Sequence, residues 1–160
     1  MKAFLLSVLW LTAIGILSNP AARLIPRRFN AEAFPFAPFA FEQGGKIYNK
    51  IHIKKWKQHV PDMSRILKKL PNKRIAQSDT EELETLVQEC CVAETVHWCL
   101  AALSLCILLF WRSAVSALLI IVYNLFGNLP FIMIQRYNRP RLLRSLEHER
   151  RLAEKMHEKA

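Results

Sequence analysis

A carboxylate and an imidazole stand three residues apart, at Glu94 and His97, in a stretch with a helical pattern. The apolar residues before them recur on one helix face: Leu83, Leu86, Val87 and Cys90. Continued at about 100° per residue, this face reaches Glu94 and then His97. Residues i and i+3 are neighbours on a helix. Glu94 could therefore fix the imidazole tautomer while His97 takes a proton from a hydroxyl group, as in general base catalysis.

The same spacing also fits a purely structural pair. An ion pair or a hydrogen-bonded pair between Glu94 and His97 would fix the packing of two helices without any chemistry. The spacing alone does not separate these two readings, and we keep both.

Amide side chains on a later apolar stretch could face this pair. Asn124, Asn128 and Gln135 share one helix face if Pro130 only kinks the helix. A proline leaves a backbone carbonyl one turn earlier without its donor, and broken membrane helices commonly line cavities. We therefore predict a polar pocket formed by five residues: Glu94, His97, Asn124, Asn128 and Gln135. Asparagines in apolar helices also occur as simple contacts between helices.

Cations follow these amides directly. The sequence QRYNRPR predicts a ring of arginines around the pocket entrance, with two hydrogen-bonding residues between them: Arg136, Tyr137, Asn138, Arg139 and Arg141. Arginines at the end of an apolar segment are equally typical of a signal that keeps a loop in the cytoplasm.

A second basic stretch lies earlier, where Trp56 stands among Lys54, Lys55 and Lys57. This composition would bind anionic lipid headgroups or the phosphates of a nucleotide-bearing donor. A plain solvated basic surface is the alternative.

The elements that must position these residues are helices in a membrane. The chain has 160 residues, is 52% hydrophobic and carries a formal net charge of +10. Small membrane proteins combine these properties, because apolar residues concentrate in spans and Lys/Arg in cytoplasmic loops. We predict an all-α membrane protein with about three transmembrane helices. A nucleic-acid partner is disfavoured, because the aromatic residues form no evident stacking platform.

Four segments follow from the hydropathy pattern. They are an N-terminal signal-anchor at 1–24, a cytoplasmic interfacial region at 25–91, a transmembrane hairpin at 92–134 that turns at Arg112, and a basic cytoplasmic tail at 135–160. The first segment could instead be a cleaved signal peptide. Short helices are expected over residues 46–70, and Asp79 is expected to cap the helix that follows. The positive-inside rule puts the N-terminus outside and the active side in the cytoplasm.

Metal and common enzyme motifs are missing from the sequence. Four cysteines are present without CxxC spacing, which argues against zinc and predicts reduced packing residues. HxxxxD, GxSxG, P-loop and HExxH motifs are absent. The residues alone therefore indicate a small basic membrane protein with a polar pocket at the cytoplasmic interface.

Four sequence blocks, in this order, resemble the glycosyl-4,4'-diaponeurosporenoate acyltransferase family. They are EQGGKIYNK (42–50), KKWKQHVPD (54–62), ECCVAETVHW (89–98) and NLPFIMIQRYNRPRL (128–142). One departure stands in the third block. Where the family pattern continues after Glu89 with Thr, Lys or Arg, and Arg, this chain has Cys90, Cys91 and Val92.

The resemblance implies an enzyme of a bacterial cell (inner) membrane that transfers a fatty acyl group from a thioester donor to a sugar hydroxyl. It implies acyl-CoA or acyl carrier protein as donor and no other cofactor. The acceptor would be a glycosylated carotenoid or another glycolipid. With it, His97 and Glu94 are the candidate catalytic residues. The candidate substrate-binding residues are Asn124, Asn128, Gln135, Arg136, Tyr137, Asn138, Arg139, Arg141, Trp56, Lys54, Lys55, Lys57 and Glu89.

Two matters stay open at this point. A non-catalytic membrane scaffold, or a lipid-binding module of a lipid-synthesis complex, would carry the same composition. A homodimer would supply additional pocket walls to so small a chain, and the sequence does not decide it.

Overall fold

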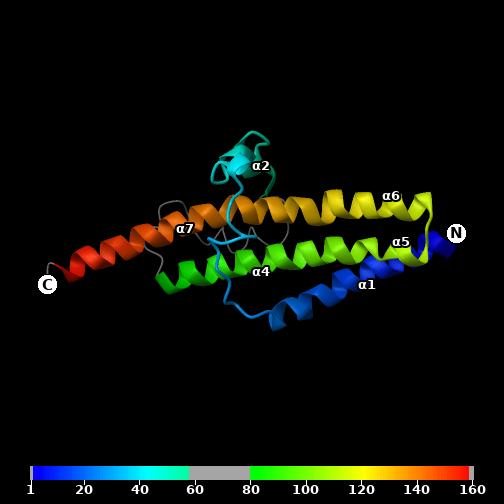
Figure 1. Ribbon diagram of the computed structural model, residues 1–160, viewed down its shortest axis with the longest axis horizontal. Coiled ribbons are helices and arrows are strands. Elements are labelled where there is room, and N and C mark those ends of the chain that lie inside the picture. Colours follow the sequence, from blue (N-terminus) through cyan, green and yellow to red (C-terminus); the bar gives the residue numbers. More distant parts are fainter. Residues whose placement is uncertain (1, 58–79, 159–160) are drawn as a thin grey trace. The chain divides into compact units, whose positions relative to one another are not determined.

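Every regular element in the described part of the chain is a helix. The computed structural model describes residues 2–57 and 80–158. Its elements are α1 (Lys2–Leu24), the 3₁₀ turns η1 (Ala40–Glu42) and η2 (Lys46–Asn49), α2 (Ile53–Trp56), α4 (Thr80–Leu105), α5 (Ile107–Phe110), α6 (Ala114–Val122), the π-helical η5 (Tyr123–Asn128) and α7 (Leu129–His157) (Figure 1).

Three helices of the described residues are long and apolar enough to cross a membrane. They are Lys2–Leu24, Thr80–Phe110 and Ala114–Met156. The predicted all-α class with three such helices, the first near the N-terminus, is therefore confirmed. The predicted turn around Arg112 is confirmed too, because α5 ends at Phe110 and α6 begins at Ala114.

The chain divides into two compact units. Unit 1 comprises Met1–Arg27 and Val92–Gln135, and unit 2 comprises Arg28–Cys91 and Arg136–Ala160. The helices α4 and α7 each contribute residues to both units.

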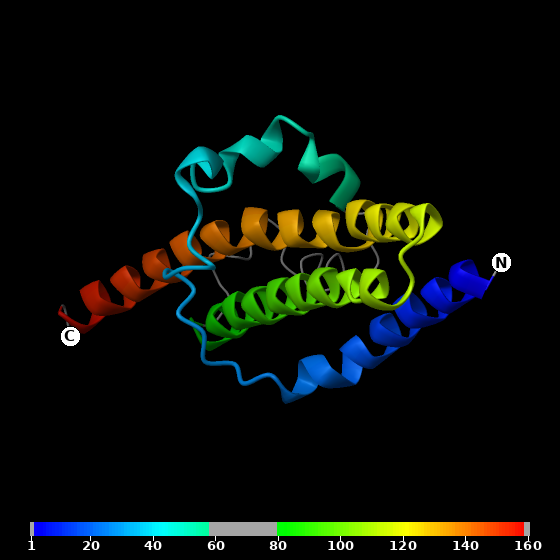
Figure 2. The same ribbon diagram turned by 45° about the vertical axis from the view of Figure 1, so that its right-hand side comes forward.

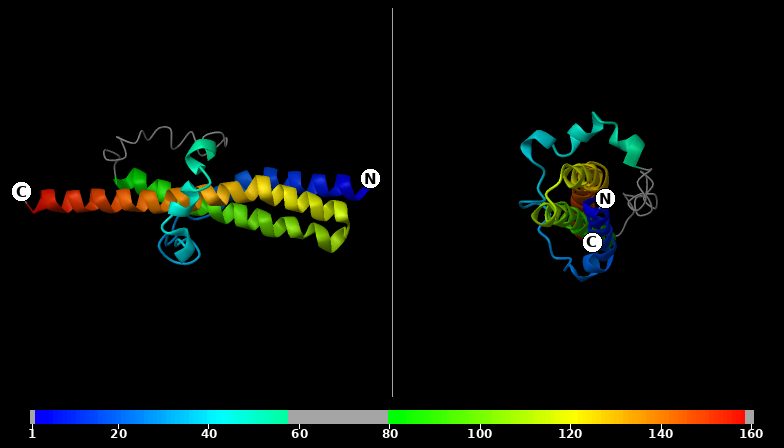
Figure 3. Two further views of the ribbon diagram at one scale, coloured as in Figure 1. Left: turned by 90° about the horizontal axis from the view of Figure 1, so that it is seen from above. Right: turned by 90° about the vertical axis from the view of Figure 1, so that its right-hand side faces the viewer.

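Unit 1 is a small bundle of apolar helices. Its core contains Leu11 and Ile14 of α1, Leu100 of α4, Ile107 of α5 and Ile120 of α6. The α5–α6 turn lies at the same end of this unit as the start of α1 (Figures 1 and 3). Buried hydroxyl groups also join α1 to α6, because the Oγ atoms of Ser7 and Ser116 lie 3.0 Å apart.

The outer surface of unit 1 is apolar as well. Large side chains stand exposed on all of its helices, for example Leu9, Leu17, Leu109, Phe110 and Phe126. Exposed apolar patches of this extent are rare on soluble monomers and suit contact with lipid tails.

Pro130 disturbs the third long helix without ending it. It is the second residue of α7 and follows directly on the π-helical η5. A proline has no N–H to continue the α-helical register, and a π-turn shifts that register by one residue. A π-helix precedes Pro130 in place of a break, and this π-helix carries both Asn124 and Asn128.

Unit 2 packs a long connecting segment against helical residues of the same unit. Its core combines Ala31 and Phe36 of the connection with residues of α4 and α7: Leu83, Leu86, Val87, Cys90, Cys91, Leu142 and Leu146. The side chain of Gln88 holds the connection, since it accepts from Phe29 N at 2.8 Å and donates to Phe29 O at 2.9 Å. The cyan stretch that leads to α2 lies beside α7 in this unit (Figure 2).

The structure tests two predictions about this unit, one fully and one in part. Cys90 and Cys91 are buried in its core, so their predicted packing role is confirmed. Cys99, in unit 1, is exposed, so that prediction is wrong for it. The short helices predicted over 46–70 are seen as η2 and α2 up to Lys57. The rest of that range, and the predicted cap Asp79, lie outside the described residues.

A buried ion pair fixes the connection to α7. Arg136 Nε and Nη2 donate to the two carboxylate oxygens of Glu42 at 2.7 and 2.8 Å, and Tyr48 donates its hydroxyl to the same carboxylate. Arg136 also donates to the carbonyls of Pro35 and Ala37 at 3.0 and 3.1 Å. Glu42 and Arg136 are only 1% and 5% exposed, so both charges of this pair lie away from bulk water.

The surroundings of this buried pair alter the pKa values of Glu42 and Tyr48. Burial alone would raise the pKa of Glu42, but hydrogen bonds from Arg136, Tyr48 and the Phe39 N–H outweigh it and hold that pKa below its ordinary value of 4.5. Burial raises the pKa of the Tyr48 phenol, and the neighbouring carboxylate raises it further.

We expect Glu42→Gln to destabilise the protein by about 3–5 kcal/mol, because it leaves the Arg136 charge buried without its counter-ion. The free energy of unfolding of the full chain in detergent, followed by circular dichroism, measures this. Because the pKa of Glu42 is lowered in the folded state, its contribution is present above the unfolded pKa and is lost as pH falls through the folded pKa. The variant should lack this component of acid destabilisation.

The matched control is Glu147→Gln, which removes a carboxylate from the exposed i,i+4 pair with Arg151. Its cost should stay below about 1 kcal/mol. Equal effects of the two substitutions would contradict the importance assigned to the buried pair.

Candidate active site

A chain of hydrogen bonds in unit 1 ends on His97. The Nδ1 atom of His97 lies 3.1 Å from Asn128 Oδ1. The amide nitrogen of Asn128 donates to Asn124 Oδ1 at 3.0 Å. The amide nitrogen of Asn124 donates at 2.9 Å both to Ser104 Oγ and to the Ile120 carbonyl. The helix α4 supplies His97 and Ser104, and the π-helix η5 supplies the two asparagines.

The direction of this chain fixes the imidazole tautomer. Ser104 donates its own proton to the Ala101 carbonyl at 2.7 Å, so it accepts from Asn124. Each amide then presents its nitrogen to the previous member and its oxygen to the next, and Asn128 presents an oxygen to His97. An amide oxygen only accepts, so Nδ1 carries the hydrogen and Nε2 keeps a basic lone pair.

The imidazole ring is also held from its face. The ring of Phe131 stacks on it at 4.5 Å between centroids, with 15° between the planes. His97 is half-buried, so the ring is oriented without being fully enclosed.

Three of the five residues predicted to form the pocket are thus brought together: His97, Asn124 and Asn128. The contact described for Glu94 is with Trp98, whose Nε1 donates to Glu94 Oε1 at 3.4 Å. Gln135 is 1% exposed, and its amide atoms have no hydrogen-bond partner among the described residues. The chemical roles of Glu94 and Gln135 stay predictions.

Ser104 belongs to this chain and was missed from the sequence. It follows His97 by seven residues, which is two helical turns along the same face. That spacing was the available signal.

An apolar groove of about 640 Å³ adjoins the same asparagines in unit 1. It is lined by Trp98, Ala101, Ala102, Leu105, Ile120, Ile121, Asn124, Leu125, Asn128, Leu129 and Ile132. Its volume lies within the range of about 300–1,000 Å³ typical of ligand sites. Because Asn128 both lines the groove and bonds His97, the groove and the imidazole share a residue.

Two of the arginines predicted at a pocket entrance are enclosed within unit 2. Arg136 is enclosed by Glu42 and two carbonyls. Arg139 is 1% exposed, donates to the Phe36 carbonyl and lies 5.3 Å from the centre of the Phe36 ring. The connection in unit 2 covers both side chains, which the local sequence does not reveal.

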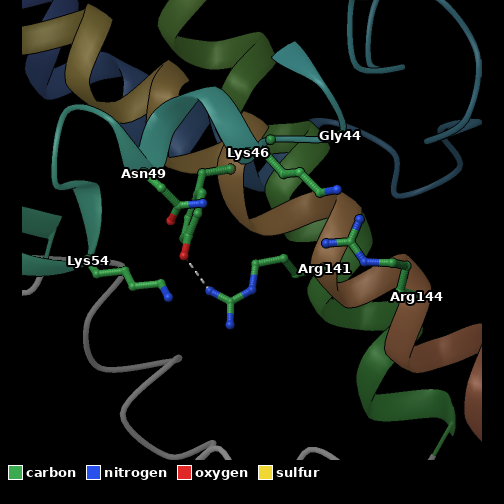
Figure 4. Close-up of a pocket in the computed structure, with 8 residues that line it drawn as sticks. Gly44, Lys46, Asn49, Lys54, Arg141 and Arg144 are labelled. Carbon is green, nitrogen blue, oxygen red and sulfur yellow. Dashed lines mark hydrogen bonds between the residues drawn. The ribbon is translucent and has the colours of Figure 1, made fainter.

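Arg141 does line a pocket, within unit 2. This basic pocket has a volume of about 170 Å³ and is lined by Gly44, Gly45, Lys46, Asn49, Lys54, Tyr137, Arg141 and Arg144 (Figure 4). Lys54, Tyr137 and Arg141 were predicted site residues, whereas Lys46, Asn49 and Arg144 were not. Arg144 follows Arg141 by three residues on α7, and this spacing was the signal for it.

Lys57 lies at the edge of this cluster of cations. Its Nζ donates to Asn138 Oδ1 at 3.1 Å and lies 4.9 Å from the centre of the Tyr137 ring. Arg141 lies 5.1 Å from the same ring centre. Burial, together with the positive charges of Arg141 and Lys54, lowers the pKa of Lys57 to about 8.

The remaining predicted binding residues are not among the residues that line either pocket. Lys55 is exposed on α2, and Trp56 donates its Nε1 to the Ile51 carbonyl at 3.1 Å. Glu89 is half-buried on α4 within unit 2. Across residues 2–57 and 80–158, no group of three or more His, Cys, Asp or Glu side chains could hold a metal ion.

Several known proteins similar to this chain share one name. Residues 32–148 match the family model for glycosyl-4,4'-diaponeurosporenoate acyltransferase. Proteins with that name from Staphylococcus aureus strains N315 and USA300 are each 31% identical to this chain over 156 residues. The alignment covers 96% of this chain and 93% of each relative. No solved structure matches the chain.

We expect the ε-amino group of Lys57 to titrate near pH 8 in the folded protein. Removing a neighbouring positive charge with Arg141→Gln should raise this pKa, because less repulsion then opposes protonation. NMR of ¹³C-methylated lysines in the detergent-solubilised full chain would measure both values. Arg150→Gln removes a charge elsewhere on α7 and should leave Lys57 unchanged; a shift as large as that from Arg141→Gln would contradict the local cause.

Proposed function

The chain belongs to the glycosyl-4,4'-diaponeurosporenoate acyltransferase family and is an acyltransferase, and we propose that it transfers a fatty acyl group to a sugar hydroxyl of a membrane glycolipid. A carotenoid glycoside is the first candidate acceptor, since the similar proteins are named for a glycosylated carotenoid acid. The observation that carries this proposal is the oriented His97, whose Nε2 lone pair is left free by the hydrogen bond to Asn128.

His97 acts as the general base in this proposal. Its Nε2 takes the proton of the sugar hydroxyl while the oxygen attacks the carbonyl carbon of the acyl thioester. The carbon–sulfur bond then breaks, the sulfur leaves as a thiolate, and the proton returns from the imidazolium to the sulfur. The acyl chain ends on the sugar oxygen and the histidine regains its starting tautomer.

Asn128 and Asn124 are positioning residues for His97 in this scheme. They hold one tautomer and one ring orientation through the hydrogen bonds that continue to Ser104. One N–H of Asn128 is engaged by Asn124, and the Asn128 side chain also hydrogen-bonds Tyr123, so donation to the oxyanion that forms on the thioester carbonyl would require the Tyr123 contact to break. Glu94 remains a candidate to stabilise the imidazolium charge.

The apolar groove is the proposed site for a hydrocarbon chain. Its lining is hydrophobic apart from the two asparagines and the indole N–H of Trp98, which suits an acyl chain or a polyene with its polar end toward the amides. The donor in this proposal is an acyl thioester of coenzyme A or of acyl carrier protein.

We also propose that the protein lies in the bacterial cell membrane with unit 2 on the cytoplasmic side. Lys and Arg are abundant in its connection and tail, and such residues stay in the cytoplasm. Acyl thioester donors are made and used in that compartment, so this orientation gives the enzyme access to its donor.

The proposal is tested by expressing the protein in a host that makes a glycosylated carotenoid, followed by mass spectrometry of the lipids. We expect wild type to add an acyl chain. His97→Ala should lower the yield by about 10²–10⁴-fold, the usual contribution of a general base.

The matched control is His148→Ala, which removes an exposed imidazole from α7 and should leave acylation unchanged. Expression levels of all variants are compared by immunoblot. Acylation by His97→Ala at the level of wild type would refute the assigned base, and no acylation by any protein would favour a non-catalytic scaffold or another acceptor. Full activity of Glu94→Gln would remove Glu94 from the mechanism.

A further inference from the structure

The basic pocket of unit 2 gathers positive charge that no described residue lining it neutralises. Four cationic side chains line it: Lys46, Lys54, Arg141 and Arg144. None of the described residues that line the pocket carries a carboxylate. Lys46, Lys54 and Arg144 form no ion pair with the described residues, in contrast to Arg136.

Two segments hold these cations against one another. Arg141 and Arg144 stand one turn apart on α7, and the Tyr137 hydroxyl accepts from Arg141 Nη1 at 2.6 Å, which orients that guanidinium. Lys46 and Lys54 come from the facing stretch around η2 and α2. Figure 4 shows the labelled cationic side chains reaching from these two segments.

Two glycines with positive φ shape the facing backbone beside α7. Gly45 has a φ of +87°, and a Cβ there would lie 3.4 Å from the carbonyl oxygens of Arg136 and Tyr137. Gly44 has a φ of +62°, and a Cβ there would lie 3.6 Å from Arg144 Nη1. Any larger residue at these positions would be strained, so the pocket depends on both glycines.

Crowded like charges raise the free energy of the empty site. Repulsion is also seen in the pKa of Lys57, which the charges of Arg141 and Lys54 lower. A bound anion would relieve it and gain charge-assisted hydrogen bonds, with guanidinium groups offering the paired donors that suit phosphate oxygens.

We propose that this pocket binds a phosphate or diphosphate group. Its volume of about 170 Å³ is below that of a whole drug-sized site, so it takes the phosphate part of a larger molecule. The bearer is the diphosphate of a coenzyme A thioester, and this choice of bearer rests on the proposed acyltransferase function. The same chemistry could come from an anionic phospholipid headgroup, which the test separates.

The test uses the full chain in nanodiscs of zwitterionic phosphatidylcholine and isothermal titration calorimetry. Coenzyme A and inorganic pyrophosphate should bind and compete, whereas pantetheine, which lacks the phosphates, should not compete. The double variant Lys46→Gln/Arg144→Gln should weaken both phosphate ligands by about tenfold or more per cation removed. Both residues are exposed, so the substitutions should leave the fold intact.

The matched control is Lys155→Gln/Arg151→Gln, which also removes one lysine and one arginine, here from the exposed end of α7. This control should bind both phosphate ligands as wild type does. If neither coenzyme A nor pyrophosphate binds to wild type, or if both double variants lose binding equally, the pocket is overturned. Nanodiscs of phosphatidylglycerol form the second arm. If this lipid displaces pyrophosphate from wild type while coenzyme A never binds in phosphatidylcholine, the phosphate site stands and coenzyme A is overturned as its bearer.

Turnover measured on the same samples separates this inference from the proposed function. Acyl transfer by wild type together with unchanged coenzyme A binding by the pocket variant would overturn the pocket and leave the function standing. Coenzyme A bound at the pocket without acyl transfer to a glycolipid would support the pocket and overturn the function.

Discussion

An amide oxygen set 3.1 Å from an imidazole nitrogen, that of Asn128 beside His97, is the contact on which this account depends. Polar side chains packed between apolar helices must satisfy one another, and here they do so in a directed series that ends on backbone carbonyls. Direction matters more than proximity, because it assigns the proton to Nδ1 and the lone pair to Nε2. The π-helix η5 contributes by carrying both asparagines beside α4.

In unit 2 the arginines of α7 divide into two kinds. Arg136 is enclosed with Glu42 and holds the connecting segment, which in turn brings the glycines and lysines of residues 44–54 to the helix. Arg141 and Arg144 are left to line the basic pocket. A single helix thus supplies both the buried cation that builds the unit and the cations that remain for a ligand.

Much of this could be predicted from the sequence, because helical periodicity is local. The apolar face leading to His97, the i,i+4 asparagines and the turn at Arg112 all follow from spacing within one or two helices. The partner of Glu42 did not follow, since 94 residues separate it from Arg136. The same limit applies to the arginines, whose burial is decided by a distant segment that covers positions 136 and 139. Helix spacing placed Asn128 near His97, but it could not decide which residue forms the hydrogen bond with the imidazole.

The most direct measurement is the rate of acyl transfer by purified His97→Ala with and without added imidazole, using a fatty acyl-CoA donor and a glycosylated carotenoid acceptor in detergent. If His97 is the base, the variant should be slower by about 10²–10⁴-fold and imidazole should restore part of the rate in proportion to its concentration. A variant as fast as wild type without imidazole would contradict the account.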